Sequence, residues 1–377
     1  MWVSSLEATN FRNYELVGLE LSSGPNLLFG ENGQGKTNLL EAIHYCSTLE
    51  SHRVAGYQAL IKENTQTSQL AIKAKHSNRE VLVGIELNRD RANRHFLAGN
   101  PVRKPQELLG WVQSVLFAPE DLDLVRRDPA DRRAFMDEVI SQLKPRMLGV
   151  RQDYERVLKQ RNALLKSAKT VKTPDLSTLE IWDEQLVRLG VEIILQRLAL
   201  VEQLGPLLQS FYQRLANNQD SITLGLISAI GDDDQYSELP KEPAQLSSMF
   251  HERLEYLRSK ELERGITLVG PHRDELLIQK NGLLAKSHAS QGEAWSIALG
   301  LKLGYAQLLR DSNSAGDPVL LLDDVFAVLD VGRRTRLLEF VLDFEQVIVS
   351  AADRSMAPDI HWSRVFEISG GEAQVAN

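Results

Sequence analysis

The first third of the chain is built from short apolar or alternating runs, and this pattern predicts β-strands rather than helices. Apolar positions recur at every second residue or in brief continuous blocks, and Pro119 ends the last of them. The expected strands are residues 3–8, 14–21, 26–29, 70–75, 81–87, 94–97 and 115–117. We therefore expect a β-rich N-terminal part.

The pattern becomes helical near residue 128. Asp128 and Pro129 are typical of a helix N-cap followed by proline at the first helical position, and helical spacing then continues to about residue 216. Pro145 and residues 170–177 interrupt it. A last helix is expected at residues 244–262, and strand-like runs return at residues 222–227, 266–269 and 276–279.

This order of elements predicts an α/β domain that is split in sequence. The expected division is residues 1–122 and 262–377 for the split domain, and residues 123–261 for a mainly helical insertion that forms a short arm.

Composition narrows the class of protein. The 377 residues are 43% apolar and 25% charged, which is ordinary for a globular chain, and no apolar run approaches the roughly 18 residues of a membrane span. The N-terminal residues do not have the pattern of a signal peptide, and the single cysteine, Cys46, excludes an internal disulfide. We expect a cytoplasmic protein. The net charge of −8 gives no sign of nucleic-acid binding, but it does not exclude a local basic surface.

The strongest chemical signal is a phosphate loop. Residues 30–37 match G-x-x-x-x-G-K-[ST] between a strand-like run and a helical pattern, the context that this motif requires. There, backbone amides and a helix N-terminus face the phosphates. We expect Lys36 to reach the β- and γ-phosphates and Thr37 to bind Mg²⁺, and a chance glycine turn is the alternative. The expected nucleotide-binding residues are Gly30, Glu31, Asn32, Gly33, Gln34, Gly35, Lys36 and Thr37.

Two carboxylates follow a second apolar run, residues 318–322. A continuous apolar run fits a buried parallel strand, and ligands bind at the carboxyl ends of such strands. We expect Asp323 to bind Mg²⁺, directly or through water, and Asp324 to polarise the attacking water. Together with Lys36 they form the expected catalytic group. The alternative is a surface turn after a core strand.

A third signal opens a predicted helix. Ser290, Gln291, Gly292 and Glu293 resemble the signature motif of ABC-type ATPases, which presents a hydroxyl, a glycine amide and a helix N-terminus to the γ-phosphate of ATP held by another subunit. Residues 369–372 match the consensus letters better, but no helix follows them, so we expect a terminal turn there. Asp353 stands near the usual place of a switch histidine and is a candidate for sensing the γ-phosphate.

Taken in order, these motifs resemble those of the RecF family of bacterial recombination mediators, which is related to the heads of chromosome-structural-maintenance (SMC) ATPases. Two departures concern the expected dimer interface: Ala327 and Val328 stand where Ser-Glu is common, and Arg127 stands where glycine is common. The matching segments are residues 10–14, 30–37, 119–122, 132–137, 270–274, 290–293, 322–326 and 329–330.

The resemblance implies an ABC/SMC-like P-loop ATPase head with a mixed sheet, bound to ATP and Mg²⁺. It implies an ATP-dependent homodimer in which each phosphate loop faces the other subunit's signature. It also implies sequence-independent binding to single-stranded or gapped DNA, help in loading recombinase with the partners RecR and RecO, and a role in replication restart and the SOS response. Asp324 replaces the usual glutamate, so we expect slow, DNA-stimulated hydrolysis that acts as a switch.

Arg12 resembles an arginine that approaches phosphate or adenine in related heads, and a salt bridge is the alternative. His272 lies either near the nucleotide or dimer seam, or in a structural hydrogen bond.

Contacts to DNA are sought among basic groups. Residues 156–172 contain six Lys or Arg and no acid, and a second group lies at residues 89–104. The candidates are Arg156, Lys159, Lys166, Arg91 and Arg94. A solvated surface is the alternative for both groups.

Three other functions stay open: the ATPase subunit of a membrane transporter, a short-armed chromosome-organising ATPase, and a structural clamp without turnover.

Overall fold

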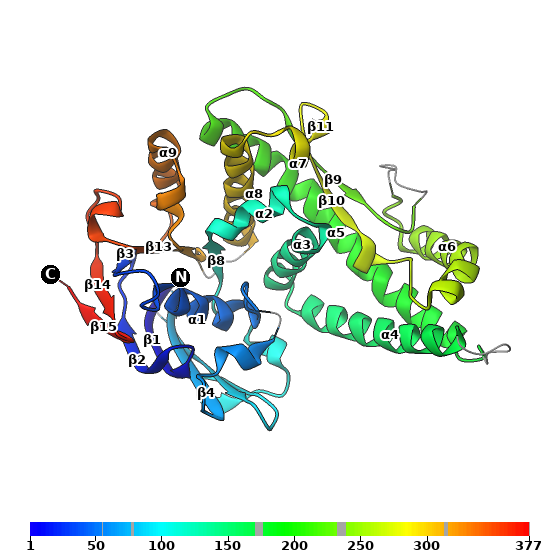
Figure 1. Ribbon diagram of the computed structural model, residues 1–377, viewed down its shortest axis with the longest axis horizontal. Coiled ribbons are helices and arrows are strands. Elements are labelled where there is room, and N and C mark those ends of the chain that lie inside the picture. The colour runs from blue at the N-terminus through cyan, green and yellow to red at the C-terminus, as the bar shows by residue number, and fades with distance from the viewer. Residues whose placement is uncertain (55, 77–78, 170–175, 232–238, 313–315, 377) are drawn as a thin grey trace. The chain divides into compact units, whose positions relative to one another are not determined.

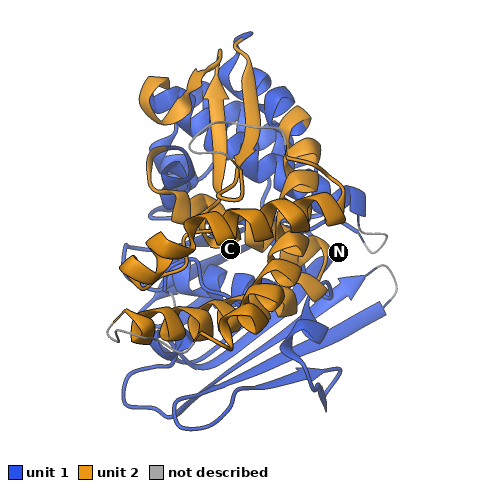
Figure 2. Cartoon of the chain, turned by 90° about the vertical axis from the view of Figure 1, so that its right-hand side faces the viewer, with its two compact units in different colours: residues 1–125, 207–219, 290–377 blue, residues 126–206, 220–289 orange. Residues whose placement is uncertain are grey.

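A computed structural model of the chain describes residues 1–54, 56–76, 79–169, 176–231, 239–312 and 316–376. The chain forms two compact units (Figure 2). Unit 1 contains Met1–Val125, Leu207–Gln219 and Ser290–Asn377, and unit 2 contains Arg126–Pro206 and Asp220–Ala289. Residues 262–289, which the sequence pattern placed with the split domain, therefore fall in the helical unit, since their strands pair with a strand of that unit.

Unit 1 contains two six-stranded sheets among its described residues (Figure 1). The first is antiparallel, in the order β2-β1-β4-β5-β6-β7. Its strands are β1 (Trp2–Phe11), β2 (Tyr14–Glu20), β4 (Thr67–His76), β5 (Arg79–Asn88), β6 (Arg94–Leu97) and β7 (Asn100–Pro101). The alternating pattern predicted all of these except β7, because one face of such a sheet is buried and the other is solvated.

The second sheet of unit 1 is mixed, in the order β15-β14-β3-β13-β12-β8. Only the terminal pair, β14 with β15, is antiparallel. Its strands are β3 (Gly24–Phe29), β8 (Ser114–Phe117), β12 (Val319–Leu322), β13 (Gln346–Ala351), β14 (Arg364–Ser369) and β15 (Glu372–Val375). The expected mixed sheet is confirmed. The expected terminal turn is confirmed too, because Gly370 and Gly371 turn the chain from β14 into β15.

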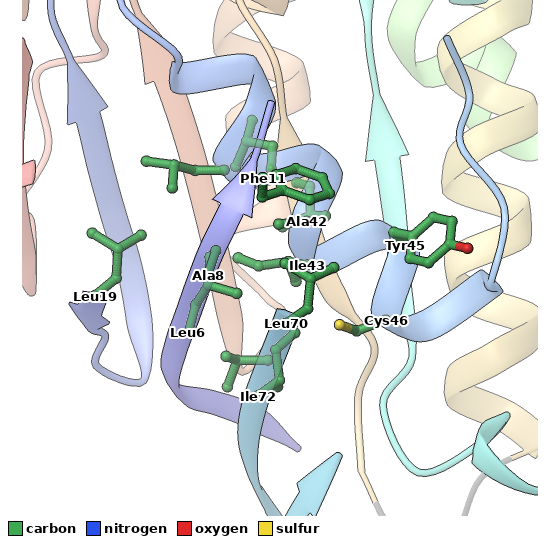
Figure 3. Packing of buried hydrophobic residues seen from close by; sticks show 14 of the residues in the cluster. Leu6, Ala8, Phe11, Leu19, Ala42, Ile43, Tyr45, Cys46, Leu70 and Ile72 are labelled. Carbon is green, nitrogen blue, oxygen red and sulfur yellow. The ribbon is translucent and has the colours of Figure 1, made fainter. Parts of the chain in front are cut away.

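Helix α1 (Lys36–Thr48) contacts strands of both sheets, among them β1, β4, β8 and β13. Its side chains join one apolar cluster with both sheets, which is why nearly the whole helix is buried (Figure 3). Ile43 and Cys46 lie in it beside Leu6 and Ile72 of the antiparallel sheet. The prediction that Cys46 fills the core is confirmed. The other long helices of this unit are α8 (Gln291–Ser312) and α9 (Val331–Val341).

Unit 2 is mainly helical. Its long helices are α3 (Pro129–Leu143), α4 (Arg146–Ala168), α6 (Pro243–Arg264) and most of α5 (Leu179–Ala216), which continues into unit 1 after Pro206. Its sheet has the order β11-β10-β9, with β9 (Ile222–Ile227), β10 (Glu275–Lys280) and β11 (Leu283–Leu284). The predicted break at Pro145 separates α3 from α4. Within the predicted break at residues 170–177, residues 170–175 lie outside the described residues, and residues 176–177 are not helical.

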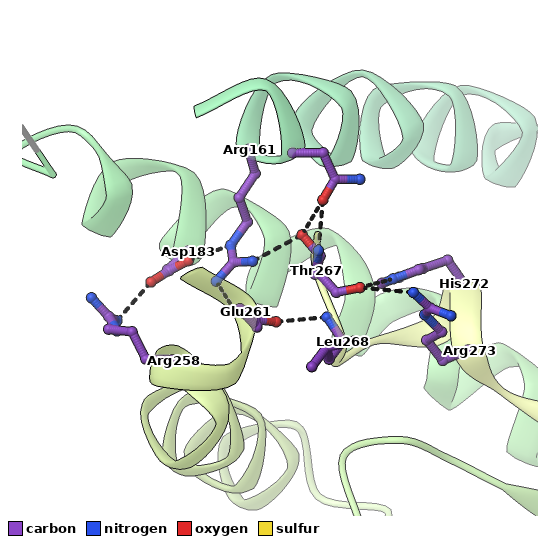
Figure 4. Close-up of polar contacts among 9 residues, drawn as sticks. Arg161, Asp183, Arg258, Glu261, Thr267, Leu268, His272 and Arg273 are labelled. Carbon is purple, nitrogen blue, oxygen red and sulfur yellow. Dashed lines mark hydrogen bonds and ion pairs between the residues drawn. The ribbon is translucent and has the colours of Figure 1, made fainter. Parts of the chain in front are cut away.

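One predicted strand of unit 2 is wrong. Residues 266–269 carry an apolar, β-branched pattern but form no strand, because side chains occupy their backbone groups. The Asn162 side chain accepts the Thr267 N–H at 2.7 Å, and Glu261 accepts the Leu268 N–H at 2.7 Å. Arg161 of α4 also holds this segment, because its guanidinium donates to the Thr267 hydroxyl at 2.8 Å. The same guanidinium binds Asp183 and Glu261 (Figure 4).

Candidate nucleotide-binding site

The phosphate loop connects β3 to α1 and is shaped by its glycines. Gly30 has φ 153°, and a Cβ placed on it would lie 2.2 Å from the Ile368 carbonyl oxygen of β14. Residue 30 must therefore be glycine for the loop to leave the sheet beside β14. The expected strand, loop and helix follow one another as the motif requires.

Lys36 is folded over the loop that precedes it. Its Nζ donates to the Gly30 carbonyl at 2.6 Å and to the Glu31 carbonyl at 3.0 Å, and the residue is only 4% exposed. The loop thus contains a buried cation together with the N-terminal amides of α1, an arrangement that suits a phosphate.

Thr37 and Asp323 meet at the other side of the loop. The Thr37 hydroxyl donates to Asp323 Oδ1 at 3.0 Å, although 286 residues separate them in sequence. The two residues come together because β12 and β13 lie parallel in the sheet that also contains β3, so the ends of these strands lie beside the loop.

Ser350, at the end of β13, completes this cluster and was not singled out by the sequence analysis. Its hydroxyl donates to Asp323 Oδ1 at 2.7 Å and accepts the Asp324 N–H at 2.9 Å. Asp324 has φ 49°, a left-handed conformation that Asp tolerates better than most residues. Ser350 thereby holds the carboxylate of Asp323 and the backbone amide of Asp324. The only signal for it in the sequence was its place at the end of an apolar strand.

The donor set of this cluster fits Mg²⁺. Thr37 and Asp323 offer a hydroxyl and a carboxylate, the oxygen ligands that this hard cation prefers. Burial raises the pKa of Asp323 more than the hydrogen bonds from Ser350 and Thr37 lower it. A divalent cation would oppose that effect, because its charge favours the carboxylate.

Arg12 forms the salt bridge that was the alternative reading of this residue. Its Nε and Nη2 donate to both oxygens of Glu41, at 2.8 and 2.7 Å. Burial raises the pKa of Glu41, but hydrogen bonds from Arg12 and Ser51, and the charge of Arg12, bring that pKa below its ordinary value. The Arg12 guanidinium is thus anchored on α1, the helix that the phosphate loop opens.

The signature residues open α8 as expected, and Ser290 and Glu293 form a reciprocal capping box. Glu293 accepts the Ser290 N–H at 2.8 Å, and the Ser290 hydroxyl accepts the Glu293 N–H at 3.3 Å. Ser290 and Gln291 are exposed, and Gly292 and Glu293 are half-buried. This geometry leaves the first turn of α8 at the surface of unit 1.

Asp353 and His272 have local partners. Asp353 caps a short helical turn and accepts the Ser355 N–H at 2.8 Å, and its bonds with Ser355 lower its pKa. His272 belongs to unit 2, where its Nδ1 lies 2.7 Å from the Tyr154 hydroxyl. Burial lowers the pKa of His272 to about 4, so the ring is neutral near pH 7. Its contacts are those of a structural hydrogen bond.

The candidate DNA contacts fall into two separate groups. Arg156, Lys159 and Lys166 are exposed on α4 of unit 2, with Arg156 bound to Asp153 at 2.9 Å. Arg91 and Arg94 belong to unit 1. Arg91 lies 3.1 Å from Glu86, and Arg94 is exposed. Lys172, at the end of the basic run, lies outside the described residues.

The mixed sheet, the phosphate loop and the Thr37–Asp323–Ser350 cluster define a P-loop ATPase head of the ABC/SMC type. The head of an SMC protein bound to the winged-helix domain of ScpA shares this fold, with TM-score 0.53 at 16% identity over 100% of this chain and 98% of that chain. None of the described helices has the length and apolarity needed to cross a membrane.

Comparison with known proteins then gives the family. A profile described as "RecF/RecN/SMC N terminal domain" matches residues 2–375. The chain is 45% identical to "DNA replication and repair protein RecF" of Clavibacter michiganensis subsp. michiganensis, over 99% of this chain and 95% of that protein. The solved "Structure of the recombination mediator protein RecF-ATP in RecFOR pathway" matches with TM-score 0.90 at 28% identity, covering 100% of this chain and 98% of that one. The chain belongs to the RecF family.

Proposed function

We propose that this protein is an ATP-dependent DNA-binding protein of recombinational repair and replication restart. The observation that carries the proposal is the cluster of Thr37, Asp323 and Ser350 beside the phosphate loop. The names of the relatives support it, since one is a DNA replication and repair protein and another is a recombination mediator with ATP. They favour this function over a transporter subunit. The partners RecR and RecO, a role in the SOS response and a cytoplasmic location stay predictions.

In this proposal the chain's own residues hold and hydrolyse ATP slowly. The loop amides and Lys36 bind the β- and γ-phosphates, and Thr37 and Asp323 would hold Mg²⁺, which would supply positive charge to the phosphates. Asp324 orients the attacking water. Its side chain is one methylene shorter than the glutamate usual in ABC ATPases, which places its oxygen farther from the water and makes turnover slow.

The signature residues of one copy complete the site of the other. The phosphate loop and residues 290–293 belong to the same unit, and the N-terminus of α8 lies at the surface of that unit, where a helix N-terminus suits a γ-phosphate. ATP between two copies would then be part of a two-fold symmetric interface, and binding would favour the dimer. Loss of the γ-phosphate would open the dimer and release the protein from DNA.

Sedimentation with ATP and a gapped duplex tests this function. We expect the wild type to dimerise on DNA only with ATP, and Ser290→Arg to remain monomeric, because the arginine occupies the place of the γ-phosphate. Ser312→Arg puts the same side chain at the exposed far end of α8 and should dimerise normally. Ser290→Ala removes the hydroxyl that caps the helix without adding a bulky side chain, so it distinguishes loss of the cap from a steric block. A wild type that stays monomeric with ATP and DNA would overturn the proposal.

A further inference from the structure

Arg333 links the start of α9 to the start of α8, both of which belong to unit 1. It stands in the first turn of α9, just after the 3₁₀ turn Val325–Val328 that follows the two carboxylates. The Asp330 side chain caps this helix by accepting the Arg333 N–H at 3.0 Å, and it also forms an ion pair with the Arg333 guanidinium. The backbone and the side chain of Arg333 are thus both tied to Asp330.

The same guanidinium reaches the signature helix. Arg333 Nε donates to the Ser296 hydroxyl at 2.9 Å, and that hydroxyl donates to the Gly292 carbonyl at 3.1 Å. A continuous series of hydrogen bonds therefore runs from Asp330 through Arg333 and Ser296 to the signature residue Gly292. Arginine suits this position because its planar group carries donors that point in two directions at once.

Gly292 is the residue against which the guanidinium lies. A Cβ on residue 292 would be 2.7 Å from Arg333 Nη2 and 2.9 Å from Cζ. An arginine side chain can usually move away from such a contact, but here Asp330 and Ser296 hold it. The glycine of the signature is therefore required by the packing of its own chain, in addition to any contact it makes with a nucleotide.

We propose that Arg333 is a positioning residue that fixes the signature turn (residues 290–293) relative to the segment that follows Asp323 and Asp324. Its effect on dimerisation rests on the function proposed above, while its effect on the first turn of α8 does not. Because the guanidinium is bonded on both sides, a displacement near the carboxylates is transmitted to the residues that the other copy's nucleotide would meet.

Four variants and a matched control test the proposal. Arg333→Ala removes the link, and Arg333→Lys keeps the charge but cannot bond Ser296 and Asp330 in the same fork. Gly292→Ala forces a Cβ into the guanidinium, and the double variant Gly292→Ala/Arg333→Ala removes that clash without restoring the link. The control is Arg336→Ala on the same helix, whose side chain donates to the Leu215 carbonyl at 2.9 Å and not to α8.

We expect Arg333→Ala and Arg333→Lys to weaken ATP-dependent dimerisation by at least about tenfold, the loss of a charge-assisted hydrogen bond, while ATP affinity of the monomer stays within about twofold. The double variant should recover the melting temperature lost in Gly292→Ala but not the dimer. Dimerisation of Arg333→Ala equal to that of Arg336→Ala would overturn the proposal.

Amide hydrogen exchange of the monomer separates this inference from the proposed function. The amides of Gly292, Glu293 and Ala294 should exchange faster in Arg333→Ala than in the wild type or Arg336→Ala, whether or not the wild type dimerises. Unchanged exchange there would overturn the positioning role even if ATP-dependent dimers form.

Discussion

At the scale of single residues, the environment of a side chain decides what its chemistry can be. Lys36 and Asp323 are both buried, and their hydrogen bonds hold the two side chains beside the phosphate loop. His272 is also buried, but its partners are Tyr154 and the Thr267 carbonyl. The same residue type that serves as a switch in related ATPases is therefore used here to hold unit 2 together.

The neutral state of His272 makes stability depend on pH. Its pKa is about 4 in the folded chain and about 6.5 when unfolded, so the unfolded chain binds more protons between these values and stability falls as pH falls through them. The contribution of this residue is on the order of 3 kcal/mol above pH 6.5 and is lost near pH 4. We expect His272→Asn to flatten the pH dependence of urea unfolding in this window, unlike His251→Asn at an exposed position. An unaltered slope would contradict this role.

At the scale of elements, helix α4 shows how one sequence pattern serves two purposes. Lys159 and Lys166 are exposed, whereas Arg161, in the same basic run, is completely buried and binds Asp183 and Glu261 at 2.6 Å each. All three residues are basic, so the sequence alone does not distinguish the buried arginine from the exposed lysines. The difference follows from helical spacing, because Arg161 shares a face with the buried Val157 and Leu165.

Arg161 therefore stabilises unit 2, and its removal should be costly. Arg161→Met leaves the carboxylates of Asp183 and Glu261 without their main partner, and breaking a buried ion pair costs about 3–5 kcal/mol. Arg156→Met removes an exposed pair with Asp153 and should cost less than about 1 kcal/mol. Chemical denaturation followed by circular dichroism measures both. Equal losses in the two variants would show that the Arg161 network is not the stabilising feature.

At the scale of the whole molecule, the net charge is −8, yet α4 exposes a basic face formed by Arg156, Lys159 and Lys166. Phosphate contacts from this face would bind DNA of any sequence and release counterions, which makes the affinity fall steeply with salt. The proposed function needs such a surface, and exposed lysines with no acid between them in the run are suited to it.

The double variant Lys159→Glu/Lys166→Glu tests this surface. We expect weaker binding to duplex and single-stranded DNA alike, and a salt slope lower by up to about two units, since each phosphate contact contributes about 0.9. Fluorescence anisotropy over a range of salt concentrations measures this. A matched change on unit 1, Arg94→Glu, reports whether the second basic group contributes. A slope identical to that of the wild type would exclude α4 from the DNA contact.

The amino-acid sequence by itself determined the local features of this protein. Strand periodicity, the phosphate loop and the helix start at Ser290 depend on residues that are close in the chain, so their spacing predicted them. Residues 266–269 were predicted wrongly from their spacing, because the side chains that prevent a strand there lie on α4 and α6.

Only the tertiary structure decided which distant residues share the site. The Thr37 hydroxyl meets Asp323 across 286 residues, Ser350 holds the Asp323 carboxylate and the Asp324 amide, and Arg333 lies against Gly292. These contacts depend on the order of strands in the mixed sheet and on the packing of α8 and α9, which involve long-range pairings that no local pattern encodes.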